Sequence, residues 1–134
     1  MGTQPYSSQE LFKKAAGWRC AVTTQEIGRL GEQLAARYVQ KQGYRLLAMN
    51  YRTRWGEIDL IAQDVDTVVF IEVKTRKDAA FAAAADAVTP AKQQRLRSAA
   101  LQWLAEKGER PMRFDVIEVY TADRRVHHIP NAFI

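Results

Sequence analysis

The sequence has 134 residues, 47% of them hydrophobic, and its twenty Lys and Arg exceed its fifteen Asp and Glu to give a formal net charge of +5. This length suits one globular domain with a substantial core and argues against a second domain. The positive charge favours polyanionic partners, and the single cysteine, Cys20, excludes an intrachain disulfide.

No stretch of the chain has the length and apolarity of a membrane span. The most apolar run, AAFAAAADAV, is short and includes Asp86, and the first residues lack the uninterrupted apolar core of a signal peptide. We therefore expect no membrane association, no signal peptide and a cytoplasmic location.

The chain opens with a weakly patterned segment, residues 1–23, which we interpret as an N-terminal arm. A helix is predicted over residues 24–41, because apolar side chains recur there at helical spacing: Ile27, Leu30, Leu34 and Tyr38. Thr23 or Thr24 is a suitable N-cap and Gly43 a suitable end. Gly28 and Gly31, three residues apart, would let this helix approach a sheet closely.

Three strands are predicted next, over residues 44–53, 57–63 and 67–75, because each is rich in β-branched, aromatic or Leu residues. Thr89 and Pro90 then form an N-cap and N1 pair for a second helix, whose apolar stripe consists of Leu96, Ala100, Trp103 and Leu104 and ends before Gly108. Residues 113–121 alternate as a fourth strand, and residues 125–129 suit a short fifth. The order α-β-β-β-α-β-β predicts an α/β fold.

The second and third strands carry charges among their apolar residues. A short connection makes them an antiparallel hairpin, and pairing Asp64 with Thr67 would place Asp59 opposite Glu72 and Glu57 opposite Lys74. In this register five apolar residues would share the other face: Ile58, Leu60, Val69, Ile71 and Val73. Opposed carboxylates repel each other, so we expect something to offset the repulsion.

A divalent cation, Mg²⁺ or Mn²⁺, is the candidate, because one or two carboxylates together with water are the usual ligands of Mg²⁺. Lys74 would then lie beside the metal, where an ammonium group can stabilise charge developing on a phosphate. The alternative is a solvent-facing strand surface on which Glu57 pairs with Lys74 and Asp59 is hydrated. Asp115 is expected to anchor Arg113 or a loop, and His127 and His128 should point to opposite faces of a strand, so neither pattern predicts a metal site.

The hairpin segments GEIDLIAQD and VFIEVKTR, with GRLGEQLAARYV upstream and VTPAKQQRL and RFDVIEV downstream, resemble the YraN-like family of bacterial proteins. That family is similar to the Holliday-junction-resolvase branch of the PD-(D/E)xK nucleases, and the resemblance covers residues 24–134. It implies a single nuclease-like domain with a restriction-endonuclease-like, three-layer α-β-α core around a mixed sheet.

The resemblance also assigns roles to residues. It implies that Asp59 and Glu72 bind the metal and that Lys74 is the catalytic lysine, with Glu32 and Gln93 as further catalytic residues from the two helices. Ile58 stands where the nominal motif has Pro. Without the resemblance, Glu32 and Gln93 would be ordinary helix-surface residues.

Basic residues flank the proposed site and would form a rim for nucleic-acid phosphates: Arg52, Arg54, Arg76, Lys77, Lys92, Arg95 and Arg97. Trp55 and Tyr51 could stack on unpaired bases, although either could instead pack at a strand end. No predicted helix has the pattern of a base-reading element, so we expect recognition of structure and not of sequence.

Three functions remain open from the sequence. The leading hypothesis is a metal-dependent endonuclease acting on DNA. The alternatives are a nucleic-acid-binding module that retains the fold but does not cleave, and an adaptor whose acidic hairpin face contacts a protein. The resemblance implies branched DNA as substrate, for which a homodimer would be suited, but neither follows from the residues themselves.

Overall fold

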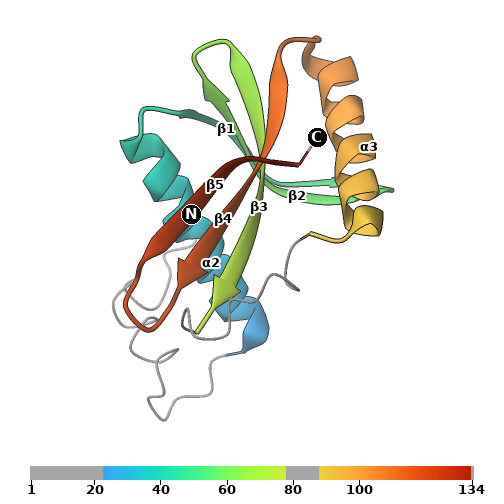
Figure 1. The fold of residues 1–134 in the computed structure, drawn as a ribbon. Helices are drawn as coiled ribbons and strands as arrows, with labels where there is room; N and C mark the ends of the chain where they lie inside the picture. Colours follow the sequence, from blue (N-terminus) through green and yellow to red (C-terminus); the bar gives the residue numbers. More distant parts are fainter. Residues whose placement is uncertain (1–22, 78–87, 134) are drawn as a thin grey trace, which may run out of the picture.

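The computed structural model describes residues 23–77 and 88–133, and its elements follow the predicted order (Figure 1). They are α2 (Thr24–Lys41), β1 (Arg45–Thr53), β2 (Gly56–Asp64), β3 (Thr67–Arg76), α3 (Pro90–Lys107), β4 (Met112–Tyr120) and β5 (Val126–Phe133). The first four predicted strands and both helices agree with these bounds to within about one residue. The predicted arm, apart from Thr23, lies outside the described residues.

Both helices begin and end at the predicted signals. The Thr23 hydroxyl accepts a hydrogen bond from the Glu26 amide at 3.1 Å, and the Glu26 carboxylate accepts one from the Thr23 amide at 3.0 Å, which forms a capping box for α2. Thr89 caps α3 in the same way by accepting from the Lys92 amide at 3.2 Å. Gly108 ends α3 with a φ of 106°, a conformation that disfavours other residues.

The five strands form one mixed sheet in the order β1-β2-β3-β4-β5. Neighbouring strands are antiparallel except β3 and β4, which are parallel and are connected through α3. A parallel connection requires a crossover, and a helix is its usual form. The α/β class and the mixed sheet are therefore confirmed.

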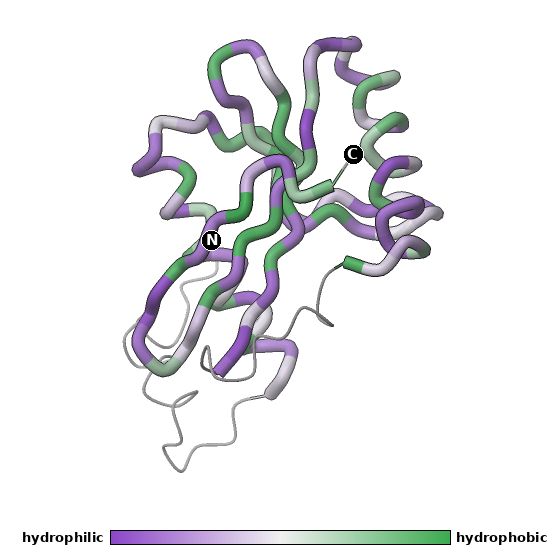
Figure 2. Tube along the Cα trace, in the orientation of Figure 1, coloured by the Kyte–Doolittle hydropathy of each residue, from purple (hydrophilic) through white to green (hydrophobic). Residues whose placement is uncertain are grey.

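The sheet is covered on both faces. Leu96 and Trp103 of α3 pack with Phe70 and Phe114 in one buried cluster, whereas α2 packs against Leu60, Ile71, Ile117 and their neighbours in a second. Consecutive residues of β3 belong to different clusters, because successive side chains of a strand point to opposite faces. Figure 1 shows the two helices on opposite sides of the sheet, and in Figure 2 hydrophobic segments concentrate where the strands cross between them. Helix, sheet and helix thus form three layers.

The hairpin departs from the predicted alternation at Ile58. Ile58 packs with Ile61 in the cluster beneath α3, while Leu60 lies in the cluster beneath α2, so Ile58 and Leu60 do not share a face as predicted. The ladder between β2 and β3 extends from Asp64–Thr67 only to Leu60–Ile71. On the other side of β2, Asn50 of β1 has a φ of 52° between the pairs Met49–Leu60 and Tyr51–Ile58. These irregularities rotate the start of β2 relative to its end, which explains the break.

The predicted fifth strand was too short. β5 continues through Pro130 to Phe133, and its pairing with β4 shifts between Phe114 and Val116. Pro130 does not end the strand because β5 lies at the edge of the sheet, where a missing amide donor is tolerated. Beyond it, Asn131 has a φ of 52°, and its amide donates to Asp115 at 2.9 Å.

Neither α2 nor α3 combines the length and the apolarity needed to cross a bilayer.

Candidate active site

Asp59 lies where β2 and β3 cease to pair. Its Oδ2 accepts a hydrogen bond from the Val73 amide at 2.8 Å, two residues beyond the last paired residue of β3. The carboxylate therefore takes the place of a backbone acceptor in the gap between the strands. This contact fixes the direction of Asp59 and replaces the direct opposition to Glu72 that the regular register predicts.

Glu72 follows immediately on β3 and is buried, with 7% of its side chain exposed. Its Oε1 is 2.7 Å from Nζ of Lys92, which reaches across from the first turn of α3. A buried carboxylate is costly unless it is paired, so Lys92 supplies the positive charge that Glu72 needs in this state.

Asp59 and Glu72 line one cavity of about 200 Å³. The cavity lies between the hairpin and α3, and its remaining lining consists of Gly56, Glu57, Lys92, Arg95 and Leu96. Since a water molecule takes about 30 Å³ of liquid volume, this space can hold a partly hydrated ion or a phosphate group. Three carboxylates, those of Glu57, Asp59 and Glu72, and two cationic side chains thus line one small volume.

Burial, together with the nearby negative charges of Glu72 and Glu32, raises the pKa of Asp59 from 3.8 to about 7. The hydrogen bond from the Val73 amide and the charge of Lys92 act in the opposite direction and do not offset these effects. Asp59 is consequently half protonated near neutral pH in the metal-free protein. Such a shift is typical of functional sites, although structural ion networks can produce it as well.

Lys74 lies on the same strand face as Glu72, because the pairing of β3 with β4 is regular from Val68 to Arg76. It is half-buried but does not line the cavity. Lys74 does not form the pair with Glu57 that the solvent-facing alternative requires. Instead, Oε1 of Glu57 lies 3.8 Å from Nε of Arg52. Lys74 thus lies two residues beyond Glu72 on the same face of β3, outside the cavity that Asp59 and Glu72 line.

Glu32 reaches the site from α2. Its Oε1 accepts a hydrogen bond from the Asn50 side-chain amide at 2.9 Å, and its charge contributes to the raised pKa of Asp59. Asn50 adopts its left-handed conformation at the position across from Asp59 on β1. Asp59 is therefore close enough to both Glu32 and Glu72 to interact with them electrostatically, and Glu32 does not line the cavity.

Gln93, in contrast, forms hydrogen bonds with α3 and with the residues just before it. Its side-chain amide donates to the Val88 carbonyl at 2.9 Å, and its oxygen accepts from Arg97 at 3.4 Å. Gln93 does not line the cavity, whereas Lys92 and Arg95, predicted only as rim residues, do.

The predicted basic rim is divided between exposed and paired residues. Arg52, Arg54, Lys77 and Arg95 are exposed. Arg76 instead forms an ion pair with Glu118 at 3.0 Å, with only 17% of the Arg76 side chain exposed, so it is held within the sheet surface. The guanidinium of Arg54 lies over the Trp55 ring at 4.4 Å, and Trp55 is 44% exposed at the β1–β2 turn. Tyr51 is turned inward, where its hydroxyl donates to Glu106 of α3.

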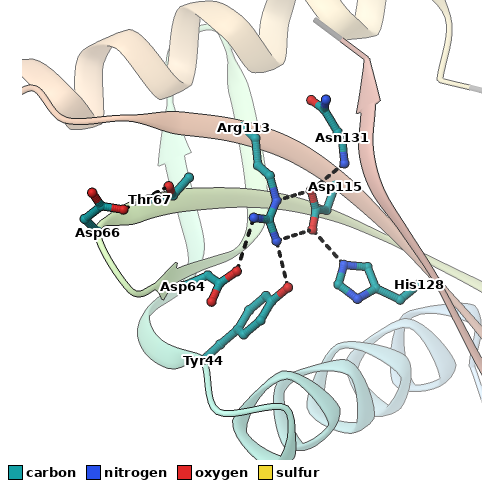
Figure 3. A network of polar contacts seen from close by, with 8 residues as sticks. All are labelled: Tyr44, Asp64, Asp66, Thr67, Arg113, Asp115, His128 and Asn131. Atoms are coloured by element: carbon teal, nitrogen blue, oxygen red, sulfur yellow. Dashed lines mark hydrogen bonds and ion pairs between the residues drawn. The ribbon is translucent and has the colours of Figure 1, made fainter.

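A second polar network lies apart from the cavity, on the α2 side of the sheet (Figure 3). Arg113 donates to Asp115 at 3.0 Å, to Asp64 at 3.3 Å and to the Tyr44 hydroxyl at 2.7 Å. Asp115 is fully buried and lies 2.7 Å from His128. The expected anchoring of Arg113 by Asp115 is confirmed. His128 contacts Asp115 and His127 contacts Glu118, on the opposite face, as predicted.

The carboxylates of the cavity suit some metals better than others. In the described part of the chain, no three His, Cys, Asp or Glu side chains gather into a metal-binding cluster. This donor set does not fit zinc, which takes three or four protein ligands. It does fit Mg²⁺ or Mn²⁺, because Mg²⁺ retains several waters and is commonly held by one or two carboxylates and a substrate phosphate.

Two partnerships of the site were not predicted from the sequence: Lys92 with Glu72, and Asn50 with Glu32. The first joins residues twenty positions apart and the second residues eighteen apart. The only local signal was Asn50 itself, because Asn is one of the few residues that tolerate positive φ. Nothing in the sequence around Lys92 distinguishes it from the other basic residues of α3.

Comparison with known proteins gives a family for the chain. Residues 31–119 match the model of a family described as "Uncharacterised protein family UPF0102". A UPF0102 protein of Alkaliphilus oremlandii is 47% identical over 81% of this chain and 97% of its own length. One from Mycolicibacterium vanbaalenii is 51% identical over 78% of this chain and 88% of its own. The matched region includes the cavity and the Asn50–Glu32 contact, and the YraN-like assignment is confirmed: the chain belongs to the UPF0102 family.

Proposed function

We propose that the protein is a metal-dependent endonuclease that hydrolyses phosphodiester bonds in DNA, built on a restriction-endonuclease-like core. The observation that carries this proposal is the pair of carboxylates, Asp59 and Glu72, which line one cavity with Lys92 and Arg95. A buried surface with only a structural role has no need for a second carboxylate whose charge raises the pKa of Asp59.

Asp59 and Glu72 would hold Mg²⁺ or Mn²⁺. Such an ion supplies Lewis acidity toward a phosphate oxygen and a water of lowered pKa. Asp59 must be ionised to bind the cation. The hydrogen bond from the Val73 amide fixes the orientation of the ionised carboxylate.

Cationic side chains would act on the phosphate. Arg95 is exposed and lines the cavity, so it can bind a phosphate oxygen there. Lys74, next along the strand face from Glu72, is placed to stabilise the negative charge that develops during hydrolysis. Glu32, oriented by Asn50, is a further acidic group near Asp59 and can accept a hydrogen bond from an attacking water.

Cleavage of defined DNAs tests the proposal. Duplex, single-stranded and four-way-junction DNA would be incubated with the purified protein in Mg²⁺, Mn²⁺ or EDTA. We expect cleavage in either metal, none in EDTA, and its loss in Lys74→Ala but not in Lys107→Ala, which removes a lysine at the far end of α3. Equal rates for Lys74→Ala and wild type would indicate a contaminating nuclease, and no cleavage of any substrate would contradict the proposal.

One observation favours the second candidate, a binding module that does not cleave. Trp55 precedes Gly56 of the cavity lining and is 44% exposed, and Arg54 stacks on its ring, which forms a platform for an unpaired base. This candidate predicts salt-sensitive binding to single-stranded DNA, weakened by Trp55→Ala, together with an absence of metal-dependent cleavage.

A further inference from the structure

Lys92 occupies the position at which a cation would neutralise Glu72. Its Nζ lies 2.7 Å from Oε1, the side chain of Glu72 is 7% exposed, and that of Lys92 is 44% exposed. The buried partner is therefore fixed in the sheet, whereas the lysine enters from solvent along the edge of the cavity. Lys92 can leave this contact without disturbing the packed core.

The same carboxylate cannot serve both cations equally well. A divalent ion bound to Glu72 would lie close to the Lys92 ammonium, and like charges at such a distance repel strongly when water is largely excluded. Either Lys92 or the metal ion therefore satisfies Glu72.

A displaced Lys92 has a suitable destination. Lys92 and Arg95 lie on neighbouring turns of α3 and line the same cavity, and the first turn of α3 has no acidic residue. The N-terminal end of a helix adds positive potential there, so an anion in the cavity would meet two cationic side chains and the positive end of the helix dipole.

We propose that Lys92 is an exchangeable counter-ion. It holds Glu72 in the metal-free protein, competes with the divalent cation for that carboxylate, and moves to the substrate phosphate when the cation binds. This inference rests on the proposed function, since it requires a cation at Asp59 and Glu72. It assigns Lys92, which lines the cavity and contacts Glu72, a role distinct from that of Lys74.

Mn²⁺ affinity, measured by calorimetry on the full chain without DNA, tests the exchange. Lys92→Gln removes the competing charge and should bind Mn²⁺ about five- to fiftyfold more tightly than wild type, a typical range for coupling between two sites. Lys107→Gln, which removes the same charge from the other end of α3, should match wild type. Unchanged or weaker Mn²⁺ affinity in folded Lys92→Gln would overturn the exchange while leaving the endonuclease proposal intact.

A second variant tests the opposite direction and retains a partner for the buried Glu72. Lys92→Arg can pair with the carboxylate through two N–H groups, so it should compete better and weaken Mn²⁺ binding. Equal or tighter binding by Lys92→Arg would count against the exchange even if Lys92→Gln did not fold. If wild type bound no Mn²⁺ at all, both this inference and the proposed metal site would fall.

Discussion

Asp59 is a residue whose ionisation lowers the stability of the metal-free protein. Its pKa is raised to about 7 by burial and by neighbouring carboxylates, so its ionised form is disfavoured in the folded state. A group of this kind lowers stability at neutral and alkaline pH, because the unfolded chain releases the proton more readily than the folded one does. Binding a cation would reverse the effect by favouring the ionised form.

The first prediction concerns the pH dependence of this cost. Between the unfolded pKa near 3.8 and the folded value near 7, the folded protein binds more protons, so stability should fall as pH rises through this window. For wild type in EDTA we expect a loss on the order of 2 kcal/mol between pH 5 and pH 8 that is absent in Asp59→Asn. Urea unfolding at both pH values measures the difference.

The Asp59→Asn variant provides its own control, because it retains both histidines and every other titrating group. At pH 8 without metal it should be more stable than wild type, and millimolar Mg²⁺ should stabilise wild type far more than the variant. Identical pH profiles and identical responses to Mg²⁺ would contradict the assignment of Asp59 as a buried, metal-binding carboxylate.

Asn50 gives the second prediction at this scale. Its side chain donates to Glu32, yet its own backbone is in a left-handed conformation that glycine adopts without strain. Asn50→Gly should therefore maintain the fold, with an unchanged or higher melting temperature, while releasing Glu32. We expect DNA cleavage to fall about tenfold or more, as when a positioning contact of a catalytic group is lost. Wild-type cleavage rates in this variant would show that the Asn50–Glu32 bond is only a surface contact.

At the scale of elements, α2 approaches the sheet through Gly31. A methyl group built on Gly31 would overlap the Thr75 side chain of β3, whereas one built on Gly28 would meet nothing within 4 Å. The sequence spacing suggested close approach at both glycines, but the structure requires it only at Gly31. Because Thr75 directly follows Lys74, the contact between Gly31 and Thr75 also holds β3 in place beside Lys74.

Paired glycine variants test this close approach. Gly31→Ala should lower stability by about 1 to 3 kcal/mol, because the helix or Thr75 must move to make room. Gly28→Ala should raise stability by up to about 1 kcal/mol, since alanine is the better helix former. Thermal unfolding of both variants measures these changes, and Thr75→Ala should partly rescue Gly31→Ala. Equal stability of the two glycine variants would mean that α2 does not press on β3.

The elements were largely predictable because their signals are local. Thr23, Thr89, Gly43 and Gly108 mark helix ends through hydrogen bonding and backbone preference that act within one turn. The two failures have longer-range causes. The break at Ile58 depends on the separation of β2 from β3, and the extension of β5 past Pro130 depends on its place at the sheet edge. Neither cause is visible in the residues concerned.

At the scale of the whole molecule, only the part of the site that lies on the β2–β3 hairpin was predictable from the sequence. Asp59 and Glu72 could be paired from a short connection and strand alternation, and the structure brings both to one cavity. Lys92 and Asn50 could not be given their partners, because α3 and β1 reach the site through tertiary packing. Gln93 was given a catalytic role only by the resemblance, and its side chain instead donates to the Val88 carbonyl and does not line the cavity.

The network around Asp115 joins more of the molecule than the cavity does. Through Arg113 and His128 it connects β2, β4 and β5 (Figure 3). The Tyr38 hydroxyl of α2 extends it by contacting His128 at 3.2 Å. Burial alone would raise the pKa of Asp115, but hydrogen bonds from His128, Arg113 and the Asn131 amide lower it. Asp115 is therefore ionised and fully satisfied in the folded protein.

The last prediction removes this central acceptor. Asp115→Ala leaves the Arg113 charge, His128 and the Asn131 amide without their shared partner, and we expect a loss of about 3 to 5 kcal/mol, as for other buried pairs that lose one member. Asp123→Ala, which breaks an exposed pair with Arg125, should cause no measurable loss of stability.

Because the pKa of Asp115 is lowered, its contribution to stability should persist at neutral pH and disappear as pH falls below the unfolded pKa near 3.8. Urea unfolding from pH 7 down to pH 3 should therefore show a steep acid loss in wild type and a shallower one in Asp115→Ala, and amide exchange should accelerate first in β5, which the network holds through His128 and Asn131. If Asp115→Ala were as stable as Asp123→Ala at pH 7, the network would be a consequence of the packing and not one of its causes.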